Sequence, residues 1–215
     1  MAIPLRGDTG SPSCSTVPSC LGGSCQAVST SALMIKTFEE ARLLVQQLQV
    51  CTIYDSAKTQ LPSLWEHVDL PEKREGEKGW GEKVSAVWDW KNRLPAEFPD
   101  EIFYGKVKGG FAVLMSMDYL RDVHFRAAYK PIAKLHPLCA SIFEKIRVEP
   151  WDTTSLRNAM IQEYGCSKSQ FDTALKNLQI SMNVVRSNDP DIEQDTWLTF
   201  QEQYPDIWNL HVSDN

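Results

Sequence analysis

A pair of glutamines near the start of the predicted folded region has the residue type and spacing that could do chemistry. Gln47 and Gln49 flank Leu48 in the segment QQLQ. An amide side chain can orient a water molecule, although it cannot act as a strong base. On a helix, residues i and i+2 point about 200° apart, so the two amides converge only if the chain turns or becomes a strand there. The alternative is two unrelated amides on a helix surface.

No other pattern in the sequence predicts catalysis. There is no Ser-His-Asp spacing, phosphate-binding loop or zinc motif. The four histidines lack ligand-like spacing, which favours ordinary core or surface positions: His67, His124, His136 and His211. Three cysteines lie in a low-complexity segment without the Cys-x2-Cys spacing of zinc sites: Cys14, Cys20 and Cys25. We therefore expect neither a metal nor another cofactor.

Positive charge gathers in the middle of the chain, although the whole protein has a net charge of −6. If nucleic acid binds, its phosphates would meet this region, where five cations are the candidate contacts: Lys106, Lys108, Arg121, Arg126 and Lys130. The alternative is an ordinary solvated helix face.

The elements that would position these residues begin after a tail. Residues 1–32 are rich in Gly, Ser, Pro and Thr without periodicity, which is typical of disorder. Thr37 and Glu40 form a capping-box pattern before a helix over residues 38–50. A short helix is expected over residues 61–70 and a longer one over residues 83–95, with Trp88 on its apolar face and Pro95 and Pro99 closing it. Two strands are then expected around Gly109 and Gly110.

The C-terminal part has the pattern of a winged helix-turn-helix. Three short helical patterns follow one another after residue 135, the second capped by Thr153 or Thr154 and ending at Gly165, and the third capped by Ser167. Two strands then flank the polar segment SNDPDIEQD, the wing tip. We predict a mostly helical α+β fold with winged-helix units and short β-hairpins, divided into residues 33–134 and 135–215.

The charge of this winged helix argues against a simple DNA-reading role. Residues 153–215 contain four cationic and nine acidic side chains. An acidic wing beside a phosphate backbone is unfavourable, so this surface favours a protein partner. With 42% apolar residues, the chain can build a core, and no apolar run is long enough to span a bilayer. Cys51, Cys139 and Cys166 lie in apolar or helical contexts and are expected to be reduced core thiols, which indicates an intracellular protein.

Several stretches resemble the AlkZ-type winged-helix DNA glycosylases and their shorter relatives. LVQQLQVCTIY resembles the segment that holds the Gln-x-Gln or Gln-x-Asp catalytic motif of that family, LPSLWEHV its downstream helix, and EIFYGKVKGGFAVLMSMDYL a segment that ends in an apolar run. The resemblance spans roughly residues 33–200 and agrees with tandem winged helices.

The resemblance implies a metal-independent enzyme that removes alkylated bases from double-stranded DNA by cleaving the N-glycosidic bond. Gln47 and Gln49 match the Gln-x-Gln form and would position the attacking water. If the motif is Gln-x-Asp, Gln49 would be its glutamine and Cys51 would stand at the position of the aspartate, so the acid is missing. The alternative prediction is therefore a relative without catalysis, a winged-helix module that binds a protein partner or regulates DNA transactions.

Overall fold

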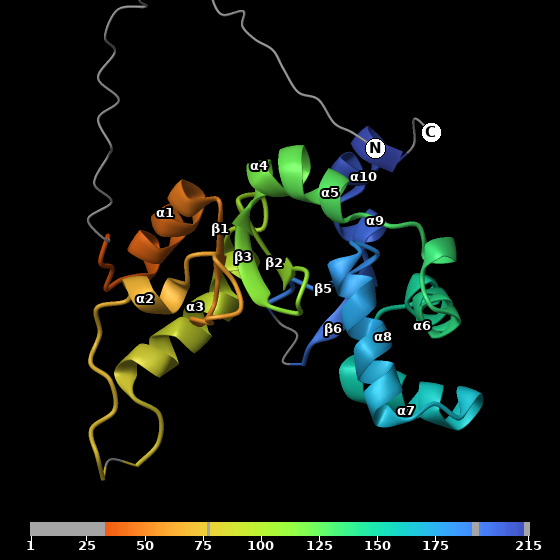
Figure 1. The fold of residues 1–215 in the computed structure, drawn as a ribbon, viewed down its shortest axis with the longest axis horizontal. Coiled ribbons are helices and arrows are strands. Elements are labelled where there is room, and N and C mark those ends of the chain that lie inside the picture. The colour runs from red at the N-terminus through yellow and green to blue at the C-terminus, as the bar shows by residue number, and fades with distance from the viewer. Residues whose placement is uncertain (1–32, 77, 191–193, 213–215) are drawn as a thin grey trace, which may run out of the picture. The chain divides into compact units, whose positions relative to one another are not determined.

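The computed structural model describes residues 33–76, 78–190 and 194–212, which form a mostly helical α+β fold, as predicted. The predicted tail, residues 1–32, and the middle of the predicted wing tip lie outside the described residues. Two successive sets of helices and strands are joined by a short helical segment (Figure 1). The division into domains at residue 135 stays a prediction.

The first set contains three helices and a three-stranded antiparallel sheet. Its elements in chain order are α1 (Phe38–Leu48), β1 (Val50–Thr52), α2 (Leu64–His67), α3 (Glu82–Glu97), β2 (Ile102–Lys106) and β3 (Ala112–Ser116). β3 lies in the centre of the sheet, between β1 and β2. α1 and α3 pack on one face of the sheet, where Leu44, Leu94 and Leu114 share a core.

The second set repeats this connectivity. Its elements are α6 (Pro137–Val148), β4 (Trp151–Asp152), α7 (Thr153–Tyr164), α8 (Lys168–Ile180), β5 (Val184–Arg186) and β6 (Thr196–Thr199). β6 again lies between the other two strands. Both sets therefore run helix, strand, two helices, two strands, with the last strand in the centre. The three helices and the hairpin of the second set were predicted, whereas β4 was missed because two residues are too few to show alternation.

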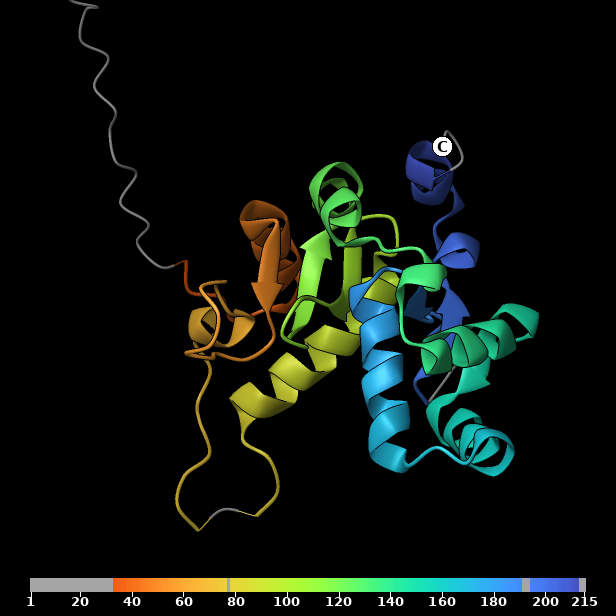
Figure 2. The same cartoon turned by 45° about the vertical axis from the view of Figure 1, so that its right-hand side comes forward.

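A helical segment joins the two sets, and a third core connects them. The joining elements are α4 (Met117–Tyr119), a π-helical turn (Leu120–His124), α5 (Phe125–Ala128) and a 3-10 turn (Ile132–Lys134). After β6 come α9 (Phe200–Gln203) and α10 (Pro205–Val212). Phe103 of β2 packs in one buried cluster with Phe125, Phe200 and Tyr204. Figure 2 shows one end of α8 next to the first sheet, and α8 contacts β2.

Local signals in the sequence explain several helix ends. Thr37 and Glu40 form the predicted capping box at the start of α1. Gly165 ends α7 with φ +63°, and Ser167 caps α8. The turn between β2 and β3 requires Gly109 and Gly110, whose φ angles of +93° and +84° are strained for other residue types.

Three local predictions were wrong. Pro95 does not close α3 but is buried inside it, because the helix continues to Glu97. Trp88 is 45% exposed, and Trp90 occupies the core instead. The cap of α7 is Asp152 rather than Thr153 or Thr154, because the Asp152 carboxylate accepts hydrogen bonds from two backbone N–H groups at 2.8 and 2.9 Å.

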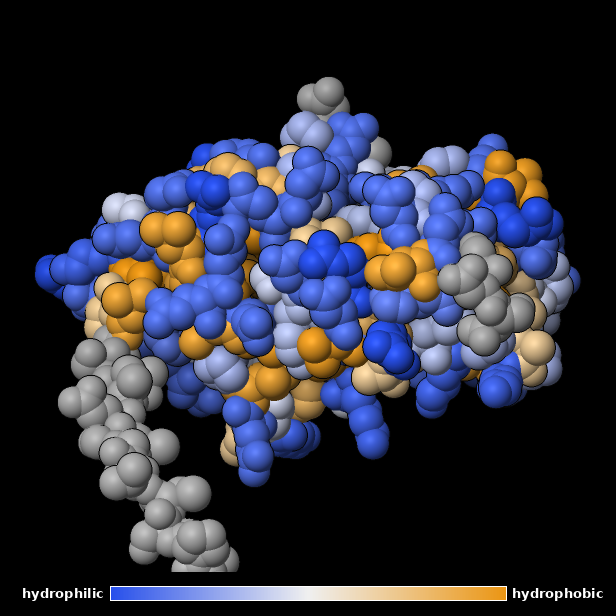
Figure 3. All heavy atoms as spheres, turned by 90° about the horizontal axis from the view of Figure 1, so that it is seen from above, coloured by the Kyte–Doolittle hydropathy of each residue, from blue (hydrophilic) through white to orange (hydrophobic). Residues whose placement is uncertain are grey.

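The surface carries no single large apolar face in the view from above. Figure 3 shows hydrophobic residues there in separate small groups, surrounded by hydrophilic side chains. Among the described helices, none is both long and apolar enough to cross a membrane.

Candidate functional site

Gln47 and Gln49 lie at the junction between α1 and β1. Gln47 is in the last turn of α1, and Gln49 ends the helix with φ +64°, an uncommon value for a residue other than glycine. The carbonyl oxygen of Gln49 accepts a hydrogen bond from the backbone N–H of Ser116, where β3 ends (2.9 Å). Both side chains are exposed. The chain therefore turns at Gln49, directly after the helix that carries Gln47.

A charged network lies at the same end of the first sheet. Arg42 of α1 donates two hydrogen bonds to the two carboxylate oxygens of Glu101, each 2.7 Å long. The Gln46 amide donates to the same carboxylate. The hydrogen bonds from Arg42 lower the pKa of Glu101, with a smaller contribution from Gln46. Glu101 is therefore an anion at neutral pH.

Glu101 and Gln49 lie on either side of β3 where that strand ends. Ser116 donates its backbone N–H to the carbonyl of Gln49, and the next residue, Met117, donates to the carbonyl of Glu101 (2.9 Å each). This end of the sheet thus presents an ionised carboxylate and exposed amides. No local spacing in the sequence marks Glu101, because its partners in α1 lie more than fifty residues away along the chain.

The β2–β3 hairpin brings a cluster of lysines to α8. Lys106 ends β2, and Lys108 is exposed in the turn before Gly110. The turn lies next to the Lys176 side chain of α8: a Cβ atom added at Gly110 would be 3.1 Å from it. Burial, and then the charge of Lys176, lower the pKa of Lys106. The structure therefore places two of the predicted nucleic-acid contacts beside a third lysine from the second set.

The other three predicted nucleic-acid contacts lie in the joining segment. Arg121 forms ion pairs with two aspartates of that segment, at 2.7 and 2.8 Å, so its guanidinium is already neutralised. Arg126 is exposed on α5. Lys130 has an exposed side chain, and its backbone hydrogen-bonds to Ser181 and Asn183 just after α8. Lys130 therefore lies at the end of the helix that carries Lys176, whereas Arg121 belongs to a separate ion-pair network.

Comparison with known families identifies the chain. The sequence profile of the AlkZ-related family matches residues 35–196, which covers nearly all elements of both sets. This chain belongs to the AlkZ-related family. Comparison with curated proteins and with solved structures gives no significant match.

In this AlkZ-related protein, Cys51 stands where the Gln-x-Asp register would require an acid. Cys51 lies on β1 and is fully buried. Burial raises the pKa of its thiol to about 12, so the thiol is neutral and shielded from solvent. It cannot replace a carboxylate in activating water. Gln47 and Gln49 are both exposed, and their catalytic role stays a prediction.

The histidines of this AlkZ-related chain belong to different helices or helical turns. His67 ends α2, His136 caps α6, and the His211 ring hydrogen-bonds to the carbonyl of Arg121 (2.7 Å). No three His, Cys, Asp or Glu side chains form a metal-binding group within the described residues. Three thiols are free and buried, as predicted: Cys51, Cys139 and Cys166.

Proposed function

We propose that this protein is an intracellular, DNA-repair-related member of its family that hydrolyses the N-glycosidic bond of alkylated bases in double-stranded DNA. The observation that carries the proposal is the turn at Gln49, where Gln47 and Gln49 are both exposed at one end of the first sheet. The repeated helix and strand order of the two sets is consistent with tandem winged helices. Family membership supports the same class of function.

The chemistry assigned to the pair is the positioning of water. An alkylated purine is cationic and leaves readily, so the attacking water needs orientation more than deprotonation. Gln47 and Gln49 would hold that water through their amide oxygens and N–H groups. Glu101 is assigned no part in the reaction, because its carboxylate is already paired with Arg42 and accepts a hydrogen bond from Gln46.

DNA phosphates would meet the lysines of the hairpin and of α8. Lys106, Lys108 and Lys176 cluster there, and Lys130 lies at the end of the same helix. Removal of one lysine that binds a phosphate should reduce the slope of log binding constant against log salt concentration by roughly one. Lys108→Ala should therefore weaken binding to all duplex sequences alike and reduce the salt slope.

The experiment that tests the proposal is release of an alkylated purine from duplex DNA under single-turnover conditions with excess protein. Gln49→Ala should reduce the rate by about 10²-fold, the scale observed when one preorganised hydrogen-bonding group is removed. Gln162→Ala, which removes an exposed helical glutamine from α7, is the matched control and should leave the rate unchanged. No base release by the unaltered protein would refute the enzymatic assignment.

A second candidate is a non-enzymatic winged-helix module that binds a protein partner or regulates DNA transactions. It is favoured by the burial of Cys51 at the position of the missing acid and by Asp189 and Asp195 in the connection between β5 and β6. This alternative predicts no base release and no salt-dependent DNA binding. A DNA titration across salt concentrations therefore separates the two candidates.

A further inference from the structure

Two cationic side chains from the two sets meet on one acceptor oxygen, far from the glutamine pair in the sequence. Lys91 of α3 donates from Nζ to the side-chain oxygen of Asn92 (2.9 Å), and Arg186 of β5 donates from Nη1 to the same oxygen (2.9 Å). The two positive charges therefore lie within two hydrogen-bond lengths of each other. A single neutral acceptor does not balance them.

The described carboxylates compensate only part of this charge. Asp195 lies 3.3 Å from Nη1 of Arg186, but no carboxylate among the described residues pairs with Lys91. Lys91 is only 8% exposed. Burial, and then the charge of Arg186, lower the pKa of Lys91 to about 8, whereas Asp195 acts in the opposite direction. Within the described parts of the chain, the site therefore holds a buried cation, Lys91, that forms no ion pair with a carboxylate.

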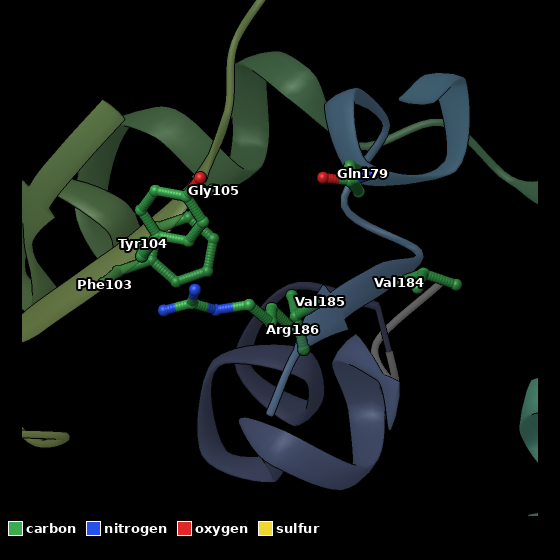
Figure 4. Close-up of a pocket in the computed structure, with 7 residues that line it drawn as sticks. All are labelled: Phe103, Tyr104, Gly105, Gln179, Val184, Val185 and Arg186. Atoms are coloured by element: carbon green, nitrogen blue, oxygen red, sulfur yellow. The ribbon is translucent and has the colours of Figure 1, made fainter. Parts of the chain in front are cut away.

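Aromatic rings hold the two cations in place without using their N–H donors. The Lys91 ammonium lies 4.2 Å from the centre of the Trp88 ring and 5.1 Å from that of Tyr104. The Arg186 guanidinium lies 4.4 Å from the Tyr104 ring, toward which it points in Figure 4. Contacts with ring faces position a cation without occupying its N–H donors.

Both cations line an open cleft of small-molecule size. The cleft has a volume of about 370 Å³ and lies between α3 and the described ends of the segment that joins β5 to β6, whose carboxylates Asp189 and Asp195 also line it. Volumes of this order are typical of sites for small ligands. Trp88, which also lines the cleft, is 45% exposed, and the exposed indole of Trp80 packs edge-on against it. Arg93 lines the cleft too, but it is already paired with two carboxylates of α3.

We propose that this cleft binds the phosphate monoester of a nucleotide, with the phosphate on Lys91 and Arg186 and the base against Trp88. A guanidinium and an ammonium supply charge-assisted donors to phosphate oxygens, and an exposed indole supplies a stacking surface. The phosphate could belong to a free nucleotide or to the 5′ end of a DNA strand, since both present the same group. The proposal involves none of the residues assigned to base release, so it goes beyond the proposed function.

Calorimetric titration of the full chain with deoxyadenosine 5′-monophosphate tests the proposal. Binding is expected for this nucleotide, but at least about tenfold weaker for deoxyadenosine, which lacks the phosphate, and for inorganic phosphate, which lacks the base. Equal binding of the nucleotide and inorganic phosphate would overturn the role of Trp88, and no binding of the nucleotide would overturn the site.

Oligonucleotides with a 5′-phosphate and a 5′-hydroxyl distinguish a free nucleotide from a DNA end as the source of the phosphate. A strand that binds only when phosphorylated, and more tightly than the free nucleotide, assigns the site to DNA ends, whereas tighter binding of the free nucleotide assigns it to the small molecule. Equal binding of the two oligonucleotides would overturn recognition of a monoester.

Matched lysine variants connect the binding to the cleft. Lys91→Met removes the charge but keeps the length of the side chain, and should weaken nucleotide binding at least about tenfold. Lys83→Met is the control, because Lys83 lies on the same helix over the Trp65 ring (4.4 Å) but pairs with Glu72 (3.5 Å). Thermal unfolding establishes that both variants are folded. Unchanged nucleotide binding by folded Lys91→Met would overturn the assignment, and unchanged base release in that variant would show that the two sites are separate.

Discussion

Replacing Phe103 by alanine tests whether the two sets of elements unfold together. Phe103 is 1% exposed on β2, and its ring meets that of Tyr204 at 5.7 Å with an interplanar angle of 65°. The same cluster contains Phe125 of the joining segment and Phe200 of α9. The side chain thus stabilises contacts between the first sheet and elements near the C-terminus.

The expected cost follows from the burial of this side chain. Truncating a buried phenylalanine to alanine costs about 3–5 kcal/mol, which includes the cavity that is left. The melting temperature of a domain of this size falls by about 2–4 °C for each kcal/mol. The melting temperature should therefore fall by roughly 6–20 °C. Trp80→Ala removes an aromatic side chain that is 63% exposed, and should change stability by no more than about 0.5 kcal/mol.

Circular dichroism gives the melting temperature, and hydrogen exchange followed by mass spectrometry shows which elements are destabilised. If the cluster couples the two sets, Phe103→Ala should accelerate exchange in α8 as well as in β2. Full protection of α8 at a temperature where β2 exchanges freely would refute this coupling. It would instead favour two independent domains, the division predicted at residue 135.

Three further predictions concern single residues. Because the pKa of folded Lys91 is about 8 and its ordinary value is 10.5, the unfolded chain binds more protons between these values. The free energy of unfolding should therefore gain a contribution that rises from pH 8 to pH 10.5 and is missing in Lys91→Met, as denaturant titrations can measure. Gly105→Ala should cost about 1–3 kcal/mol by the same method, because its Cβ would stand 2.4 Å from the Phe103 ring; unchanged stability would contradict this packing. Cys51, with a pKa of about 12, should resist a thiol reagent at pH 8 until the protein unfolds, and rapid labelling of the native protein at Cys51 would show that it is accessible.

Much of the fold could be predicted because its signals are local. The capping box at Thr37, the serine cap at Ser167 and the glycines of the β2–β3 turn depend on residues within a few positions of one another. The continuation of α3 through Pro95 could not be predicted in this way. The sequence does indicate that Trp90 rather than Trp88 faces the core, because Trp90 has the helical spacing i, i+3, i+7 with Val87 and Leu94, and Trp88 points about 200° away from Trp90.

The candidate site was predictable only in part. Gln47 and Gln49 were found by their spacing, and the structure places both at a turn. The hydrogen bonds that link Arg42 to Glu101, and the oxygen of Asn92 that joins Lys91 to Arg186, connect residues far apart in the chain. Such contacts arise only when the sheets and helices pack, so no local pattern reveals them.

The backbone conformation of Gln49 lowers the stability of the folded chain. A non-glycine residue held at φ +64° costs on the order of 1–3 kcal/mol, a strain that a glycine would relieve. Gln49 therefore lies where selection for stability alone would favour a different residue. A library of substitutions at position 49, sorted first for thermal resistance and then for base release, would reveal whether the two selections choose opposite residues.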